Sequence, residues 1–139
     1  MNRISFESRS FIDDRGKILA LNDLSLEGIK RMYQIEHPDS GMVSDWQGHK
    51  LENKWFYLIK GCFSIEYARI DNFNNPVPYT LANFKVIKSK DKVVVHIPKG
   101  YPNGLKSLEP GSIIIIFSDL ILEEAKSDNF KFDANQWLN

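Results

Sequence analysis

The chain has 139 residues, and its 18 basic side chains balance its 18 acidic ones, so that the formal net charge is zero. This balance excludes a broad electrostatic field that would attract nucleic acid or an anionic membrane. The sequence contains no run of about 18 apolar residues and no basic-then-apolar leader, and its single cysteine, Cys62, excludes an internal disulfide and two-cysteine metal motifs. We therefore expect a cytoplasmic protein with one domain, residues 1–139, and no membrane span.

Short runs of β-branched and aromatic residues follow one another along the chain. They predict strands over residues 32–35, 55–59, 62–70, 79–87, 93–97 and 113–117. Residues that favour turns separate these runs at 60–61, 72–78, 88–92 and 110–111. A turn of helix is expected within 25–31 and a short helix over 120–126. Many short strands in a chain of this length indicate an all-β sandwich or barrel.

The polarity pattern of three runs predicts their environment. Residues 63–67 alternate between apolar and polar, which favours a strand with one face buried and the other facing water or a cavity. Residues 93–95 and 113–116 are apolar throughout, as in strands that are covered on both faces or lie in a subunit interface. His37, which precedes a proline, is expected in a loop, and His96, within an apolar run, is expected to be structural.

Two motifs of cupin barrels can be laid on the chain with their spacing largely kept. The motif G-x5-H-x-H-x(3,4)-E-x6-G falls on Gly41, Gln47, His49, Lys54 and Gly61. The motif P-x-G-x2-H-x3-N falls on Pro98, Gly100, Asn103 and Ser107. The chain therefore resembles the cupins, which implies an all-β jelly-roll barrel with minor short helices. Of the four positions that hold a metal in cupins, only His49 keeps a metal-binding residue type.

The replaced positions argue against a metal in this pocket. A transition metal needs imidazole and carboxylate ligands that converge at about 2 Å, and a lysine at a ligand position repels the ion. Glu52 is a possible substitute ligand, but three residues beyond His49 in a strand it would point to the other face. We expect no metal and no other cofactor, and we rank a metal-dependent dioxygenase as a distant third reading.

Within the cupins, most of the chain resembles the dTDP-4-dehydrorhamnose 3,5-epimerases and the dTDP-sugar 3,4-ketoisomerases. Residues 11–16 resemble their D-x-R-G signature, 31–35 their R-x-Y-x-I strand, 54–61 the epimerase stretch K-L-V-x-V-x-x-G, and 97–104 the pattern I-P-x-G-x-x-H-G. Residues 41–50 align without gaps to the ketoisomerase pattern G-V-x-R-G-x-H-A-H-K. The closest resemblance is to a subgroup with W-Q-G-H-K and G-Y-x-N-G, described as sugar epimerases of polysaccharide pathways.

The resemblance implies roles for several residues, and the departures from it restrict them. Ser44 replaces a substrate-contacting arginine, and Gln47 and Asn103 replace histidines, so neither amide can abstract a proton. His49 becomes the candidate base, Lys54 the group that stabilises an enolate oxygen, and Tyr33 a candidate acid or sugar-stacking group. The substrate-binding candidates are the arginines for a nucleotide diphosphate and three uncharged residues for the sugar ring: Arg15, Arg31, Gln47, Tyr57 and Asn103.

The predicted function is epimerisation or ketoisomerisation of a nucleotide-linked 4-keto-deoxysugar for cell-surface polysaccharide, without a metal, by a homodimer. The alternative is a catalytically silent cupin that binds a nucleotide sugar or supports a partner enzyme. His49 could instead be a hydrogen-bonded interior histidine, and Gln47 and Asn103 could satisfy one another. Trp46 and Trp55 are better explained as core or interface residues than as ligand platforms. The sequence does not identify the sugar, the nucleotide or the carbon attacked.

Overall fold

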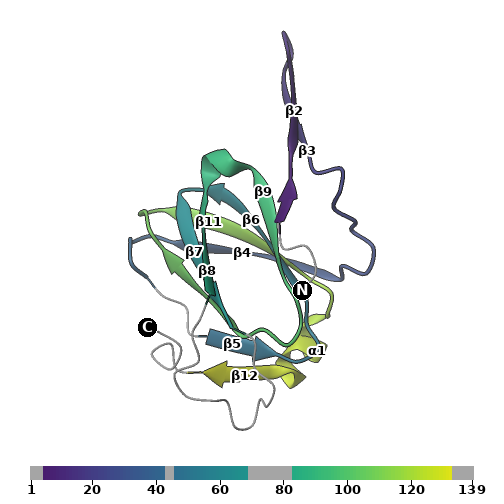
Figure 1. Ribbon diagram of the computed structural model, residues 1–139, viewed down its shortest axis with the longest axis vertical. Coiled ribbons are helices and arrows are strands. Elements are labelled where there is room, and N and C mark those ends of the chain that lie inside the picture. Colours follow the sequence, from purple (N-terminus) through teal and green to yellow (C-terminus); the bar gives the residue numbers. More distant parts are fainter. Residues whose placement is uncertain (1–4, 43–45, 69–82, 133–139) are drawn as a thin grey trace.

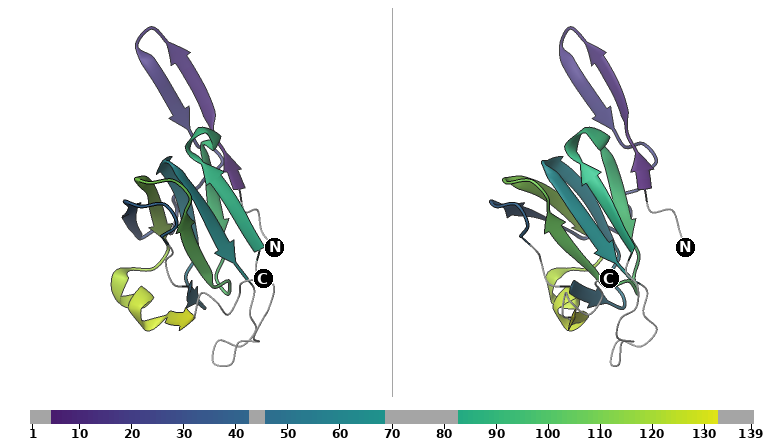
Figure 2. Two further views of the ribbon diagram at one scale, coloured as in Figure 1. Left: turned by 90° about the vertical axis from the view of Figure 1, so that its left-hand side faces the viewer. Right: turned by 60° about the vertical axis from the view of Figure 1, so that its left-hand side comes forward.

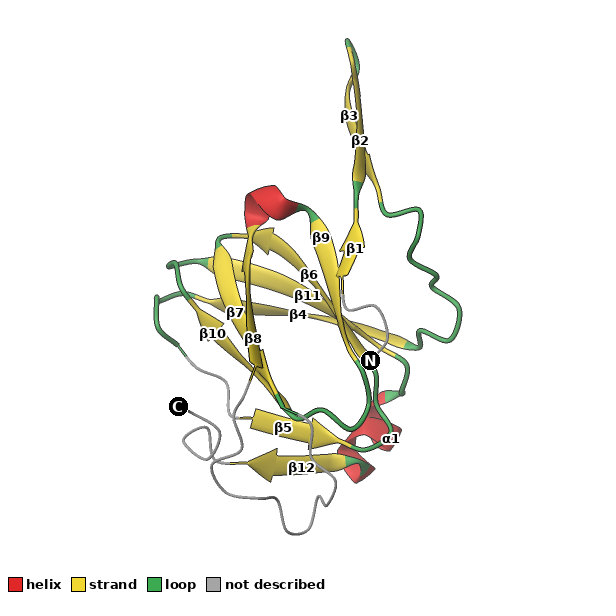
Figure 3. Ribbon diagram, in the orientation of Figure 1, coloured by secondary structure: helices red, strands yellow, loops and turns green. Residues whose placement is uncertain are grey.

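The computed structural model describes residues 5–42, 46–68 and 83–132, with the backbone alone for 46–49, 83 and 129–132. Two five-stranded sheets enclose a barrel (Figures 1 and 3), and every strand pair in them is antiparallel. The first sheet, in spatial order, is β1 (Ser5–Glu7), β9 (Val93–Ile97), β6 (Lys54–Lys60), β11 (Ser112–Ser118) and β4 (Arg31–His37). The second is β12 (Asn129–Phe132), β5 (Trp46–His49), β10 (Asn103–Ser107), β7 (Cys62–Tyr67) and β8 (Asn83–Lys88).

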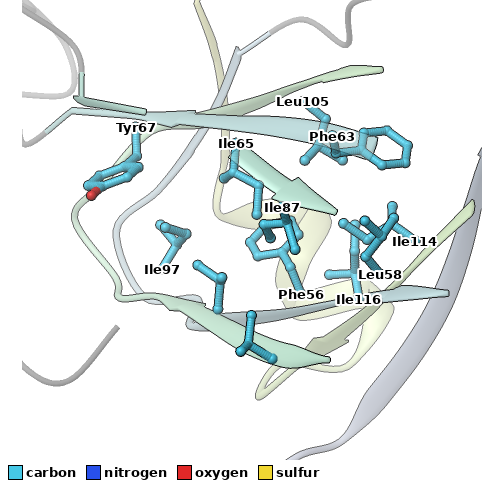
Figure 4. Packing of buried hydrophobic residues seen from close by; sticks show 12 residues of the cluster. Phe56, Leu58, Phe63, Ile65, Tyr67, Ile87, Ile97, Leu105, Ile114 and Ile116 are labelled. Carbon is cyan, nitrogen blue, oxygen red and sulfur yellow. The ribbon is translucent and has the colours of Figure 1, made fainter. Parts of the chain in front are cut away.

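The hydrophobic core lies between the two sheets. Figure 4 shows aliphatic and aromatic side chains from both sheets meeting there. The fully buried members include Phe56 and Ile114 of the first sheet and Phe63 and Ile65 of the second. Each strand sends alternate residues inward, so the inward positions of β6, β7 and β11 make up most of this core. The all-β prediction is confirmed.

The predicted strands are observed, but several others were missed. β4, β6, β9 and β11 contain the predicted runs, while parts of the runs 62–70 and 79–87 lie outside the described residues, as does the turn stretch 72–78. β7 is more buried than its alternation suggested, because only Glu66 of this strand is half-exposed. The missed strands are short or rich in polar residues and glycine, so their strand conformation comes from pairing with neighbouring strands and not from residue propensity. They are β1, β2, β3, β10 and β12.

One of the two expected helical segments is present. The helix α1 (Leu122–Ser127) lies two residues later than its predicted start and buries only Ala125. The expected turn of helix within 25–31 is wrong. Ile29 N–H donates to Leu26 C=O at 3.1 Å in an isolated turn around Gly28, whose φ is +82°, and Arg31 already begins β4. The turn 88–92 contains a 3₁₀ turn, η1 (Ser89–Asp91).

The turn that connects β6 of the first sheet to β7 of the second requires glycine. Gly61 has φ +85°, and a Cβ atom there would meet Ser112, whose Cα lies 2.9 Å away. Ser112 cannot retreat easily because its Oγ accepts from Cys62 N–H at 3.1 Å and donates to Glu109 C=O at 2.7 Å. The contact joins the β6–β7 turn to the start of β11 at the barrel end farthest along β6 from Lys54.

A hairpin of β2 (Arg9–Asp13) and β3 (Gly16–Ala20) projects from the barrel at the end opposite to β5, β12 and α1 (Figures 1 and 2). It forms a separate two-stranded sheet, and large apolar side chains on it are exposed, including Ile12 at 77% and Ile18 at 64%. Among the described residues, no helix has the length and apolar character needed to cross a membrane.

Candidate active site

Lys54 points into the barrel. In β6, Lys54, Phe56 and Leu58 are buried, whereas Trp55 and Tyr57 are half-buried on the other face. Phe56 and Leu58 belong to the core, so Lys54 shares the interior face with them. Only 7% of its side chain is exposed. The lysine predicted to stabilise an enolate is therefore an interior residue at the first position of its strand.

Glu52 is the counter-ion of Lys54. Its carboxylate has no exposed surface and lies 3.8 Å from Lys54 Nζ and 3.0 Å from Arg31 Nη2. The hydroxyl of Ser118, at the end of β11, donates to the same carboxylate. The expectation that Glu52 points to the opposite strand face is wrong. β5 ends at His49, and the chain turns before Glu52, so strand alternation does not apply.

Asp128 holds this turn in place. Its carboxylate accepts the backbone N–H groups of Lys50, Leu51 and Glu52 at 3.2, 2.9 and 3.1 Å. Asp128 is itself buried at the C-terminal cap of α1, and the next residue begins β12, which pairs with β5. The segment from α1 into β12 thus fixes both the strand β5 and the turn that carries Glu52.

Arg31 and Tyr33 complete the interior cluster from β4. The guanidinium carbon of Arg31 lies 4.9 Å from the centroid of the Tyr33 ring, a separation typical of a cation–π contact. Tyr33 packs against the hydrophobic core. The structure therefore brings together three of the predicted site residues, Arg31, Tyr33 and Lys54, with Glu52 among them.

Burial changes the acid–base behaviour of two of these groups. Burial is the main cause that lowers the pKa of Lys54 below its ordinary value of 10.5; Glu52 opposes this through its charge and a hydrogen bond, and Arg31 adds to it. Burial also raises the pKa of Tyr33 to about 12, with the negative charge of Glu52 adding to the rise and Arg31 opposing it. Tyr33 is consequently a neutral phenol at neutral pH, able to donate a hydrogen bond.

The strand that carries the candidate base lies between β10 and β12. Asn103 is directly opposite Gln47 in the β10–β5 pair, and Asn129 is opposite His49 in the β12–β5 pair. The side chain of Asn103 is buried, and its Nδ2 donates to Tyr101 C=O at 3.1 Å. Because the structure describes only the backbone of Gln47 and His49, the role of His49 as base stays a prediction. Ser44 lies outside the described residues, and for Trp46, too, only the backbone is described.

Two residues predicted to contact the substrate, Tyr57 and Arg15, lie away from the interior cluster of their own chain. Tyr57 occupies the outer face of β6, because it is separated from Lys54 by an odd number of strand positions. Arg15 lies at the tip of the β2–β3 hairpin, where its Nη2 pairs with Asp13 at 2.8 Å and its side chain is 84% exposed. Their roles as substrate contacts stay predictions, and each requires a ligand or partner outside the barrel interior of its own chain.

Two other histidines have structural surroundings. The prediction of a loop at His37 is wrong, because β4 continues to this residue, which is buried with its ring centroid 5.4 Å from that of Phe63. His96 stacks on Trp55 at 4.8 Å and 9°, and its Nε2 lies 3.2 Å from Asn53 Oδ1. The structural interpretation of His96 agrees with this geometry.

The strand β5 carries His49, the one residue at the four cupin metal positions that keeps a metal-binding type. Among the side chains that the structure describes, no three of the types His, Cys, Asp and Glu come together as metal ligands. The imidazole of His49 is outside that set, so the expectation of a metal-free pocket stays a prediction.

Sequence reasoning missed part of the cluster. Glu52 was discounted because a strand was assumed, although its spacing of two residues from Lys54 was a usable signal. Ser118 and Asp128 gave no local signal, since their bonds to Glu52 span 66 and 76 residues. The facing tyrosines Tyr67 and Tyr101, with centroids 6.4 Å apart at 59°, were also missed beside Asn103.

No protein-family model matches the chain, and no curated protein matches it in sequence. Solved structures do match it. An rmlC epimerase of Mycobacterium tuberculosis superposes with a TM-score of 0.74 at 12% identity, covering 94% of this chain and 68% of that one. The dTDP-4-dehydrorhamnose 3,5-epimerase of Bacillus anthracis, solved with TDP and PPi bound, gives 0.72 at 14%, covering 90% and 75%. A 3,4-ketoisomerase of Helicobacter canadensis gives 0.69 at 16%, covering 90% and 86%.

These similarities concern the fold. At 12 to 16% identity they show that the chain folds as a cupin-type barrel of the kind found in sugar epimerases and ketoisomerases, as the motifs predicted. The resemblance to the W-Q-G-H-K subgroup stays a prediction, because it depends on residues 46–50 and 100–104 of the sequence alone.

Proposed function

We propose that the protein epimerises or isomerises a nucleotide-linked 4-keto-deoxysugar by proton transfer. The observation that supports this most is the buried cluster of Arg31, Tyr33, Glu52 and Lys54 inside the barrel, next to the turn that follows the strand of His49. Charged side chains are rarely buried unless they are paired, and a group whose pKa is shifted by burial and a specific charged partner marks a candidate active site. Enzymes with the same fold include a dTDP-4-dehydrorhamnose 3,5-epimerase and a sugar 3,4-ketoisomerase solved in complex with TDP.

The proposed chemistry uses these residues in a defined order. His49 removes the proton from the carbon beside the C4 carbonyl, and the C4 oxygen becomes an enolate oxygen. Lys54, as an ammonium group in a poorly solvated interior, stabilises that oxygen, and the Tyr33 hydroxyl donates a hydrogen bond to it or to a neighbouring hydroxyl. For epimerisation a second group delivers a proton to the opposite face of the same carbon; the Tyr33 hydroxyl is the candidate acid, and exchange with solvent then restores the proton of Tyr33 and removes that of His49. For ketoisomerisation the hydroxyl proton of O3 moves to O4 and protonated His49 returns its proton to C4, so that the carbonyl moves to C3.

We further propose that the active species is a homodimer. The outer face of the first sheet carries an apolar patch of half-buried or exposed side chains, bordered on β4 by Gln34 and Glu36: Met32, Trp55, Tyr57, Ile59, Ile113, Ile115 and Phe117. An isolated two-stranded hairpin is marginally stable in water, so the projecting β2–β3 hairpin also calls for a surface to pack on. Both features are explained if a second copy covers them, and Arg15 could then reach the diphosphate of a ligand in the other copy.

The dimer is tested by sedimentation velocity. Ile115→Lys places a charge in the middle of the apolar face and is expected to give a folded monomer where the wild type sediments as a dimer. Lys106→Ile, on the outer face of the second sheet, is the matched control and is expected to leave the dimer intact. A wild-type monomer at micromolar concentration, or an Ile115→Lys dimer, would reject this interface.

Proton exchange in heavy water tests the activity. The protein is incubated with a dTDP- or UDP-linked 4-keto-6-deoxysugar, and NMR follows deuterium entry at C3 and C5. Wild type is expected to catalyse exchange, and His49→Ala to lose about 10²- to 10⁴-fold of the rate while Gln47→Ala retains it. Loss of exchange in Gln47→Ala instead of His49→Ala would reassign the base.

We propose the cytoplasm as the location of the protein.

A second candidate is a binding module without catalysis. It is favoured by the replacement of two histidine positions of the resembling enzymes by Gln47 and Asn103. Under this alternative, the same ligands raise the melting temperature of the protein, yet no deuterium enters the sugar. The two outcomes of one sample thus separate the enzyme from the binding module.

A further inference from the structure

The arrangement around Glu52 poses an electrostatic problem. Arg31 and Lys54 are two cations that converge on one interior carboxylate, with Arg31 only 20% exposed and Lys54 7% exposed. Two like charges held close together in a poorly solvated space disfavour each other's charged form. Glu52 is the carboxylate placed between them, so its charge affects both cations at once.

The position of Glu52 is fixed from two directions. The backbone of its turn is held by the three N–H bonds to Asp128, and its carboxylate accepts the Ser118 hydroxyl from β11. The carboxylate therefore has little freedom to follow Lys54. Lys54, which has a long flexible side chain, must instead orient its ammonium group toward Glu52.

We propose that Glu52 is a positioning residue for Lys54: it directs the ammonium group into the barrel and keeps the proton on it. The inference rests on the proposed function for its catalytic meaning, because a protonated Lys54 is what an enolate oxygen requires. With Glu52 ionised, the cluster of Arg31, Lys54 and Glu52 retains a single positive charge, which the anionic oxygen of an enolate would balance.

The charged and titratable neighbours of Lys54 in the described part of the chain set the sign of each test. Arg31 and Tyr33 face the cluster from β4, Glu52 from the turn, while β9 presents Ile97 opposite Lys54 and β11 presents Ser118. Removing the carboxylate should weaken the hold of Lys54 on its proton. Removing the guanidinium should strengthen it. Both directions agree with the charge effects on the pKa of Lys54, which Glu52 raises and Arg31 lowers.

An NMR titration tests the positioning role without any substrate. Protein with ¹³C-labelled lysine is titrated, and the Lys54 signal is assigned by its absence from Lys54→Met. We expect Glu52→Gln to lower the pH at which Lys54 loses its proton and Arg31→Gln to raise it. Glu27→Gln, which removes an exposed carboxylate from a loop, should leave it unchanged. Each variant is used only if its amide spectrum matches that of the folded wild type.

Opposite shifts in Glu52→Gln and Arg31→Gln would support the proposal, and equal midpoints in both would overturn it. If Glu52→Gln does not fold, Arg31→Gln and Glu52→Asp decide: the former must raise the midpoint, and the latter, which keeps the charge, must stay near wild type. An unchanged midpoint in Arg31→Gln would then reject the electrostatic coupling.

The catalytic part is tested on the deuterium exchange. Glu52→Gln is expected to lose about 10²-fold of the rate at neutral pH, as for loss of a preorganised charge, and the loss should shrink as the pH falls and Lys54 regains its proton. Glu52→Asp should recover the shape of the wild-type pH profile. A loss that is equal at every pH indicates a merely structural residue. If wild type shows no exchange, the proposed function fails, while the NMR titration still decides the positioning role.

Discussion

The three-fold anchoring of the turn by Asp128 gives a quantitative stability prediction. In Asp128→Ala, the N–H groups of Lys50, Leu51 and Glu52 lose a charged acceptor at 2.9 to 3.2 Å. Each such bond to a charged group contributes about 1.5–3 kcal/mol, and neighbouring bonds are not additive. Because water can reach the less buried donors, we expect a net loss of about 3–5 kcal/mol. For a domain of this size that lowers Tm by roughly 10 to 15 °C.

Asp91→Ala is the matched control for Asp128→Ala. Asp91 accepts a single exposed N–H group, that of Lys88, at 2.9 Å. Its removal should cost about 1 kcal/mol or less. Equilibrium unfolding in urea, followed by tryptophan fluorescence, measures both variants, with an unchanged m-value as the sign that the same transition is compared. Equal losses in the two variants would refute the reasoning that burial and bond number make Asp128 the stronger anchor.

Two further predictions concern Tyr33 and Gly61. The folded state holds the proton of Tyr33 to a pKa of about 12 against an ordinary value of 10.0, so its contribution to stability is complete below pH 10 and is lost as the pH rises toward 12. Between pH 10 and 12 the unfolding free energy of the wild type should therefore decrease by about 2–3 kcal/mol more than that of Tyr33→Phe. An equal decrease in the two proteins would contradict this. Gly61→Ala meets the backbone of Ser112, whereas Gly41→Ala, at a similar φ of +82°, meets nothing within 4 Å. We expect Gly61→Ala to lose about 1–3 kcal/mol more than Gly41→Ala in urea unfolding, and an equal loss would show that the turn relaxes freely.

The sequence predicted the barrel because its strongest strands are also its most apolar ones. The runs in β6, β9 and β11 form the middle of the first sheet, where β9 is buried throughout and β6 and β11 bury alternate residues in the core. It did not predict β12 or the β2–β3 hairpin. β12 is only four residues long, and the residues of the hairpin are mostly exposed, so the strand conformation of both comes from pairing partners, which composition does not reveal.

The sequence identified several residues of the candidate site correctly, but it predicted their positions in space less well. Arg31, Tyr33 and Lys54 were identified through the family resemblance, and the structure gathers them. Glu52 was misplaced because a strand was assumed to continue through a turn. Tyr57 was assigned to a pocket although its parity in β6 differs from that of Lys54, a relation that could have been read from the sequence once the strand was accepted.

The pairing of β12 with β5 has a consequence for the order in which the molecule is completed. The strand of the candidate base is held by residues about 80 positions later in the chain, since Asn129 lies opposite His49 and Asp128 bonds Lys50 across 78 residues. Contacts of such long range form late, because the intervening loop must be closed first. On a ribosome, the core strands β7 and β8 can pair while Asp128 is still unsynthesised. The candidate site is thus expected to be completed after the barrel has collapsed, in a separate and slower event than the burial of its core.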